Sequence, residues 1–142
     1  MGSLLFSFGG RINRSKYWLA ALIYFAIGLV LGLIGIVSQQ DTGYQIMSFI
    51  VNMALFVSAL AVGTKRLHDR DRSGWWLVTF YFIPAVLAVI AVGLAISDAS
   101  MVSVALFSLA AAAVSVWGFV ELGCLRGTIG SNAYGPDPSA EV

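Results

Sequence analysis

Four long apolar runs dominate the chain. An apolar stretch of about 20 residues is long enough to cross the hydrocarbon core of a bilayer as a helix. The runs cover about residues 17–37, 46–63, 75–96 and 101–123. Only the segment from Ser97 to Ser100 separates the last two runs, which indicates a tight helical hairpin. The pattern predicts an all-α integral membrane protein, a four-helix bundle that forms a single membrane domain.

Basic residues mark one side of these predicted helices. Lysine and arginine accumulate in the cytoplasmic loops of membrane proteins. All eight lysines and arginines fall in segments 1–16, 64–74 and 124–142, whereas the other two loops hold only the acids Asp41 and Asp98. The segments 1–16, 64–74 and 124–142 are therefore predicted to be cytoplasmic, and both termini with them.

Composition supports a membrane location and excludes several classes of protein. The 142 residues are 59% hydrophobic and only 11% charged, and their mean hydropathy is +0.89. A typical soluble domain contains about 25% charged residues. An ordinary soluble enzyme, a disordered chain and a nucleic-acid binder built on a basic surface are all excluded, and we expect no nucleic-acid partner.

Small and polar residues within the runs bear on assembly. Gly28 and Gly32 form a GxxxG pattern, and the alanines of the third run recur at three- and four-residue steps. Small residues mark helix–helix contacts in membranes, within one chain or between chains, so a homo-oligomer is possible. Asn52, with Ser48 one turn before it, is the most polar side chain near mid-membrane. A subunit of a small oligomeric channel or transporter is therefore an alternative.

Three polar segments carry most of the distinctive chemistry. They read FSFGGRINRSKYW at residues 6–18, RLHDRDRSGWW at residues 66–76 and GSNAYGPDP at residues 130–138. The predicted topology brings all three to one end of the helices, where they form a small cytoplasmic polar cap. In this order around four apolar runs, they resemble a bacterial membrane-protein family catalogued as domain of unknown function 805.

The resemblance covers nearly the whole chain. It implies a small, multi-pass integral protein of the bacterial inner membrane. No activity is established for the family, so the resemblance assigns no catalytic residue. The function has to be sought in the residues of the cap.

One interpretation of the cap is structural. Asp69 or Asp71 can accept a bidentate hydrogen bond from Arg11 or Arg14. Such a bond would clamp the N-terminal arm (residues 1–16) to the middle loop (residues 64–74). The last polar segment is rich in turn-forming residues. The residues predicted to hold such a cap together are Asp69, Asp71, Asn132, Tyr134 and Asp137.

A second interpretation is recognition of an anion. Lysine and arginine beside the membrane are attracted to anionic lipid by about 1 kcal/mol each. We therefore expect the cap to bind anionic membrane lipids or a partner protein. The residues predicted to surround a lipid phosphate, with the tryptophans setting their depth, are Arg11, Arg14, Arg66, Arg70, Arg72, Trp75 and Trp76.

Catalysis is the least favoured interpretation. His68 and Asp69 offer a general base and a carboxylate, but neighbouring residues on a helix point about 100° apart. A single histidine and the single Cys124 give no metal cluster, and no nucleophile or phosphate-loop motif is present. We predict no catalytic residue, no metal and no cofactor, with a membrane enzyme using His68 and Asp69 as a further alternative.

The predicted topology can be tested by labelling. Cysteines introduced at positions 41 and 98 should react with a membrane-impermeant thiol reagent added from outside, because both loops are predicted to be external. Protection of both positions would contradict the orientation.

Overall fold

The computed structural model describes residues 2–38 and 41–139, and most of these residues are helical. A short helix, α1 (Gly2–Phe6), precedes two long ones, α2 (Arg14–Ser38) and α3 (Thr42–Asp69). A π-helical turn, η1 (Val78–Phe82), leads into α4 (Ile83–Ile96). Finally, α5 (Met101–Phe119) runs into a second π-helical turn, η2 (Val120–Cys124).

Four helical stretches of the described chain are long and apolar enough to cross a membrane. They are Arg14–Ser38, Thr42–Asp69, Val78–Ile96 and Met101–Cys124. The all-α fold with four apolar helices is therefore confirmed. The predicted end segments 1–16 and 124–142 extend to residues 1 and 140–142, which lie outside the described residues.

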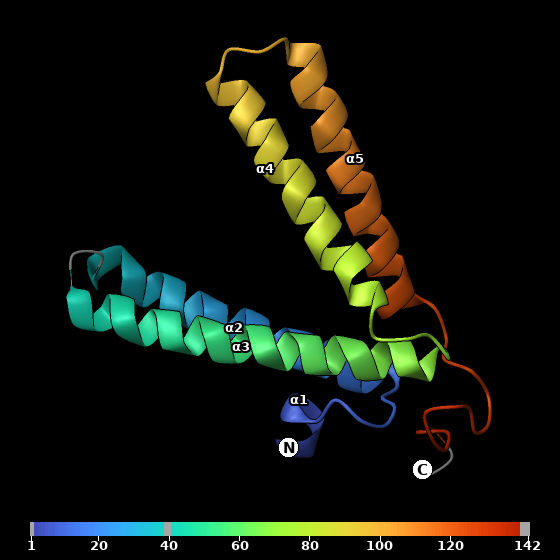
Figure 1. Ribbon diagram of the computed structural model, residues 1–142. Coiled ribbons are helices and arrows are strands. Elements are labelled where there is room, and N and C mark those ends of the chain that lie inside the picture. The colour runs from blue at the N-terminus through green and yellow to red at the C-terminus, as the bar shows by residue number, and fades with distance from the viewer. Residues whose placement is uncertain (1, 39–40, 140–142) are drawn as a thin grey trace.

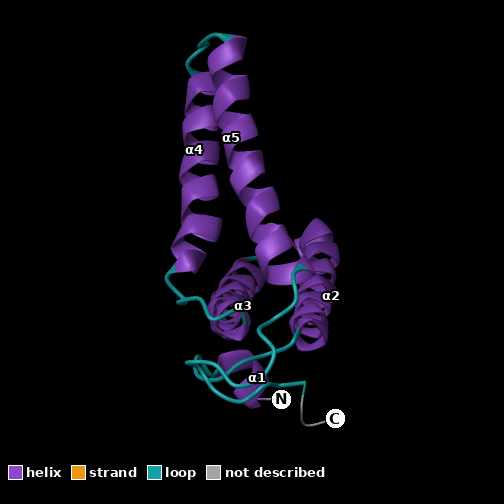
Figure 2. Ribbon diagram, turned by 90° about the vertical axis from the view of Figure 1, so that its right-hand side faces the viewer, coloured by secondary structure: helices purple, strands orange, loops and turns teal. Residues whose placement is uncertain are grey.

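The helices form two antiparallel hairpins that meet at one end (Figure 1). The α2/α3 pair and the α4/α5 pair are in contact where η1 and η2 lie, and they diverge toward their connecting turns. The described ends of the chain and the loop between α3 and η1 lie at the meeting end (Figure 2). This arrangement brings the three polar segments together.

Small residues allow α4 and α5 to pack closely. Ala91 and Ala111 are buried. A Cβ atom added at Gly118 would lie 3.0 Å from the Cβ atom of Phe80. By contrast, a Cβ atom at Gly28 or Gly32 would meet nothing within 4 Å. The GxxxG pattern of α2 therefore makes no close contact with another helix in the part of the chain that the structure describes.

Pro84 explains why the third span begins with a π-helical turn. Proline has no backbone N–H, and its ring clashes with the carbonyl four residues earlier in a regular α-helix. The N–H of Ile83 instead bonds the carbonyl of Val78, five residues back. This wider turn lets the helix continue through the proline.

The α2/α3 hairpin uses hydroxyl groups as well as apolar contacts. The hydroxyls of Tyr24 and Ser58 lie 2.8 Å apart, and the Tyr44 hydroxyl donates to the carbonyl of Leu31 over 2.6 Å. In an apolar solvent, such groups need partners inside the protein. These bonds fix how the two helices sit against each other.

Helix α1 lies along α3 on the side away from α4 and α5 (Figure 1). Leu4 and Leu5 pack against a cluster that includes Ile12 and Val62. The carbonyl of Leu5 accepts a hydrogen bond of 2.8 Å from Ser58. A short helix attached to the α2/α3 hairpin therefore leads into the first polar segment.

Replacement of Gly118 by alanine tests the packing of the second hairpin. Gly118→Ala should lower the free energy of unfolding by about 1–3 kcal/mol, because the new methyl group would crowd Phe80. Thermal unfolding in detergent measures the effect. The matched variant Gly28→Ala should not destabilise the protein, and an equal loss in both would contradict this packing.

Candidate functional site

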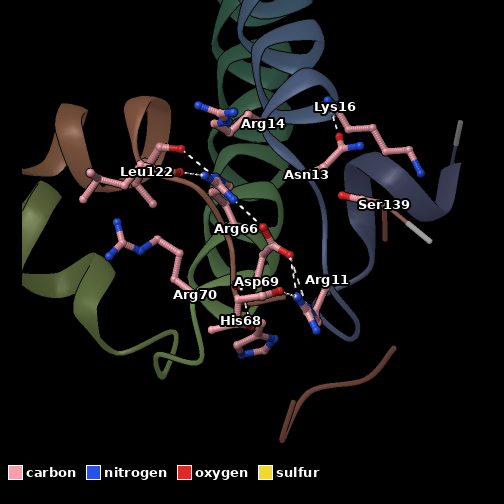
Figure 3. A network of polar contacts seen from close by, with 12 residues as sticks. Arg11, Asn13, Arg14, Lys16, Arg66, His68, Asp69, Arg70, Leu122 and Ser139 are labelled. Atoms are coloured by element: carbon pink, nitrogen blue, oxygen red, sulfur yellow. Dashed lines mark hydrogen bonds and ion pairs between the residues drawn. The ribbon is translucent and has the colours of Figure 1, made fainter. Parts of the chain in front are cut away.

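The candidate site is a network of buried ion pairs where the two hairpins meet (Figure 3). Arg11 from the N-terminal arm lies with its Nη2 atom 3.0 Å from Oδ1 of Asp69 at the end of α3. The backbone N–H of Thr128, from the C-terminal segment, donates to the carbonyl of Asp69 over 2.8 Å. The predicted convergence of the three polar segments is confirmed.

Arg11 connects the arm to both other segments. Its Nε and Nη2 atoms both donate to Oδ1 of Asp69, at 3.2 and 3.0 Å. Its remaining contacts are to carbonyl oxygens of the C-terminal segment: Thr128 at 2.7 Å, Gly130 at 2.7 Å and Gly135 at 3.2 Å. One buried guanidinium thus fixes a long loop that has little regular structure.

Arg66 occupies the other side of Asp69 and is fully buried. Its Nη1 atom lies 2.5 Å from Oδ2 of Asp69, one turn further along α3. Its Nε atom donates to the carbonyl of Leu122 over 2.8 Å, and its Nη2 atom donates to the carbonyl of Leu125. Arg66 therefore joins the end of α3 to the end of η2.

The C-terminal end of the fourth span is capped almost entirely by side chains from elsewhere. The last carbonyls of a helix have no partner within it, and they carry partial negative charge. Trp18 Nε1 donates to Gly123 and Arg14 Nη1 donates to Cys124, each over 3.0 Å. Arg66 donates to the carbonyls of Leu122 and Leu125, so Arg14 and Arg66 both have protein partners at this helix end.

Glu121 is a second buried anion, and the sequence interpretation did not identify it as a partner. Its Oε2 atom lies 2.8 Å from Nη1 of Arg70, and its Oε1 atom lies 3.3 Å from Nη1 of Arg72. The guanidinium of Arg72 also lies over the ring of Trp76, 5.2 Å from its centre. The partners are about 50 residues apart in sequence, so no local pattern links them.

The turn-forming segment near the C-terminus closes over the end of α3. Asn132 Nδ2 donates to the carbonyl of His68 over 2.8 Å, and Asn132 Oδ1 accepts from the N–H of Tyr134 over 2.9 Å. The rings of His68 and Tyr134 are stacked, with centroids 3.9 Å apart and planes 7° from parallel. Asn132 and Tyr134 therefore both hold this segment on the helix end.

The other two acids of the predicted cap lie at its surface. Asp137 accepts hydrogen bonds from the N–H groups of Ser139, at 2.8 Å, and Gly130, at 2.9 Å. These bonds stabilise the carboxylate and lower the pKa of Asp137 below its usual value. Asp71 is exposed, in a left-handed turn with φ of 57°.

The arrangement gives His68 and Asp69 different partners. Nδ1 of His68 lies 3.3 Å from the carbonyl of Gly10, whereas the carboxylate of Asp69 lies between Arg11 and Arg66. The described residues contain no group of three histidine, cysteine, aspartate or glutamate side chains that could hold a metal ion.

The predicted lipid-binding residues lie at one end of the molecule but do not surround a common point. Arg11 and Arg66 are buried around Asp69, and Arg70 and Arg72 face Glu121. The three remaining residues of that prediction differ in exposure: Arg14 is exposed, Trp75 is 81% exposed, and Trp76 packs against Phe80 and Trp117.

A polar cavity of about 240 Å³ opens beside this network at the start of α2. Its charged lining consists of two arginines, Arg14 and Arg126, and two aspartates, Asp69 and Asp137. Ser15 and Ser139 contribute hydroxyls. The mixture of charges gives this cavity no clear preference for an anion or a cation.

These observations define a class: a membrane protein of four apolar helices with a buried ionic network at one end. The chain belongs to the family described as protein of unknown function (DUF805), whose match covers residues 5–136. The family expected from the three motifs is therefore confirmed.

Relatives in Escherichia coli (strain K12) cover most of the chain. Inner membrane protein YhaI is 30% identical over 131 residues, which span 92% of this chain and 85% of the relative. Inner membrane protein YhaH is 30% identical over 136 residues, or 94% and 88% of the two chains. No solved structure matches the chain. With its four apolar helices, the protein is a multi-pass protein of the inner membrane.

Substitution of Asp69 tests the network. Asp69→Asn should lower the free energy of unfolding by about 3–5 kcal/mol, because it leaves two buried arginines without their counter-charge. Thermal unfolding in detergent measures the loss.

The matched control is Asp71→Asn. It removes the same charge two positions after Asp69. Asp71 is exposed and lies in a left-handed turn, where asparagine is well tolerated. It should change stability by less than about 0.5 kcal/mol. Equal effects of the two substitutions would show that the network does not stabilise the fold.

Proposed function

We propose that the protein is a non-enzymatic inner-membrane protein whose polar end binds anionic phospholipid. The observation that carries this proposal is the set of basic side chains exposed at that end. Asp69 and Glu121 are buried against arginines, whereas Arg14, Lys16 and Arg126 are exposed. Among the described residues, these three basic side chains outnumber the two acids of the cap that lie at the surface.

The charge count supports the proposal. The segments 1–16, 64–74 and 124–142 carry eight basic and four acidic residues, and Glu121 adds one acid from the end of the fourth span. Basic residues next to a membrane are attracted to anionic lipid by about 1 kcal/mol each. The exposed Trp75 is a side chain of the kind that lies at headgroup depth.

The predicted cytoplasmic orientation adds a second support. The cytoplasmic leaflet has a negative surface potential, so a basic surface on that side faces lipid of opposite charge. The positive-inside pattern alone accounts for basic residues in these segments. Lipid binding therefore has to be tested as a preference for anionic over neutral lipid.

The test measures the lipids that remain with the purified protein. In nanodiscs of equal parts phosphatidylglycerol and phosphatidylcholine, the lipid retained after extraction should be enriched in phosphatidylglycerol. The combined variant Arg14→Gln, Lys16→Gln and Arg126→Gln should reduce this enrichment by about fivefold or more.

The control is Asp98→Asn, which changes one charge at the opposite end and keeps a residue type that tolerates the positive φ of that position. It should leave the enrichment unchanged. Retained lipid with the bulk composition in the unmodified protein would contradict the proposal.

A further inference from the structure

A second cavity at the polar end has a different lining. It measures about 440 Å³ and lies between the N-terminal arm, the first turns of α2 and the last turns of α3. We call it the arm groove. Its basic lining residues are Arg11, Lys16 and Lys65, and its apolar ones are Leu4, Ile12 and Leu19.

The charge of the arm groove is one-sided. None of the described residues that line it is acidic, in contrast to the polar cavity beside Asp69. Lys65 is only 3% exposed, and its Nζ atom donates to the carbonyl of Leu4 over 2.5 Å. Lys16 also lines the groove and is exposed. One buried and one exposed lysine therefore contribute positive charge to the lining, and both attract an anion.

The apolar part of the groove continues onto the outer face of α2. Leu19 follows Lys16 by three residues, so both lie on one face of the helix, and Leu22 extends the same row. Leu19 and Leu22 are 43% and 62% exposed. A ligand that fits this lining has an anionic head beside the lysines and a hydrocarbon chain along the leucines.

We propose that the arm groove binds one anionic phospholipid, with its phosphate between Lys16 and Lys65 and an acyl chain along Leu19 and Leu22. This rests on the proposed function and makes it more specific, because attraction to a basic surface needs no defined site. Inorganic phosphate shares the charge of the headgroup but has no hydrocarbon chain to contact the leucines.

The experiment is native mass spectrometry of the protein released from nanodiscs of phosphatidylglycerol and phosphatidylcholine. We expect one retained phosphatidylglycerol per chain. Lys16→Gln should reduce this species by about fivefold, since it removes one of two lysines facing the phosphate. Arg126→Gln removes an exposed charge of the basic surface that does not line the groove, and it should reduce this species much less than Lys16→Gln does.

A second variant alters the shape of the groove and keeps its charge. Gly9 lines the groove, and a Cβ atom there would meet nothing within 4 Å. Gly9→Leu should therefore fold normally and reduce the retained phosphatidylglycerol. Inorganic phosphate added at millimolar concentration should not displace the lipid.

The outcomes separate this proposal from the more general one. Equal losses in Lys16→Gln and Arg126→Gln, with anionic lipid still enriched, would overturn the groove and retain binding by the basic surface. Displacement of the lipid by inorganic phosphate would reassign the groove to a free anion. Retained lipid with no preference for phosphatidylglycerol would overturn both proposals.

Discussion

The structure depends on the carboxylate of Asp69, which lies between two buried guanidinium groups. Arg11 and Arg66 approach it from opposite sides, and each also holds carbonyl oxygens of the C-terminal segment or of η2. A Cβ atom at Gly127 would lie within 2.0 Å of Oδ2 of Asp69, so the chain can pass there only as glycine. One acid thus orients the arm, α3 and the end of the second hairpin.

Several basic residues at this end have structural roles. Arg14 and Arg66 donate to the final carbonyls of the fourth span, where a helix carries partial negative charge. Arg70 and Arg72 neutralise Glu121. The structural interpretation of the cap therefore applies chiefly to the buried arginines that connect the helix ends. The lipid-binding proposals rest on Lys16, Lys65 and Arg126, and on Arg14, which also contacts a helix end.

The divergence of the hairpins follows from where the strong contacts lie. Among the described residues, the ion pairs and side-chain caps that join the α2/α3 and α4/α5 pairs lie near η1 and η2, and the apolar helices separate beyond them (Figure 1). Lipid tails are as apolar as leucine, so apolar side chains alone give little drive for the pairs to close. At their meeting end the hairpins are joined by these polar interactions and by an apolar cluster that includes Leu67, Phe80 and Leu122.

The sequence by itself determined the four helices, because their length and apolar character are set by residues next to one another. It also identified the polar segments and the family, and it named Asp69 with Arg11 as one of several possible clamps. Only the tertiary structure selected Asp69 over Asp71, paired Glu121 with Arg70, and brought Lys65 and Lys16 to the lining of one groove. These choices depend on contacts between residues about 50 or more positions apart, and no local pattern records which of several like charges becomes buried.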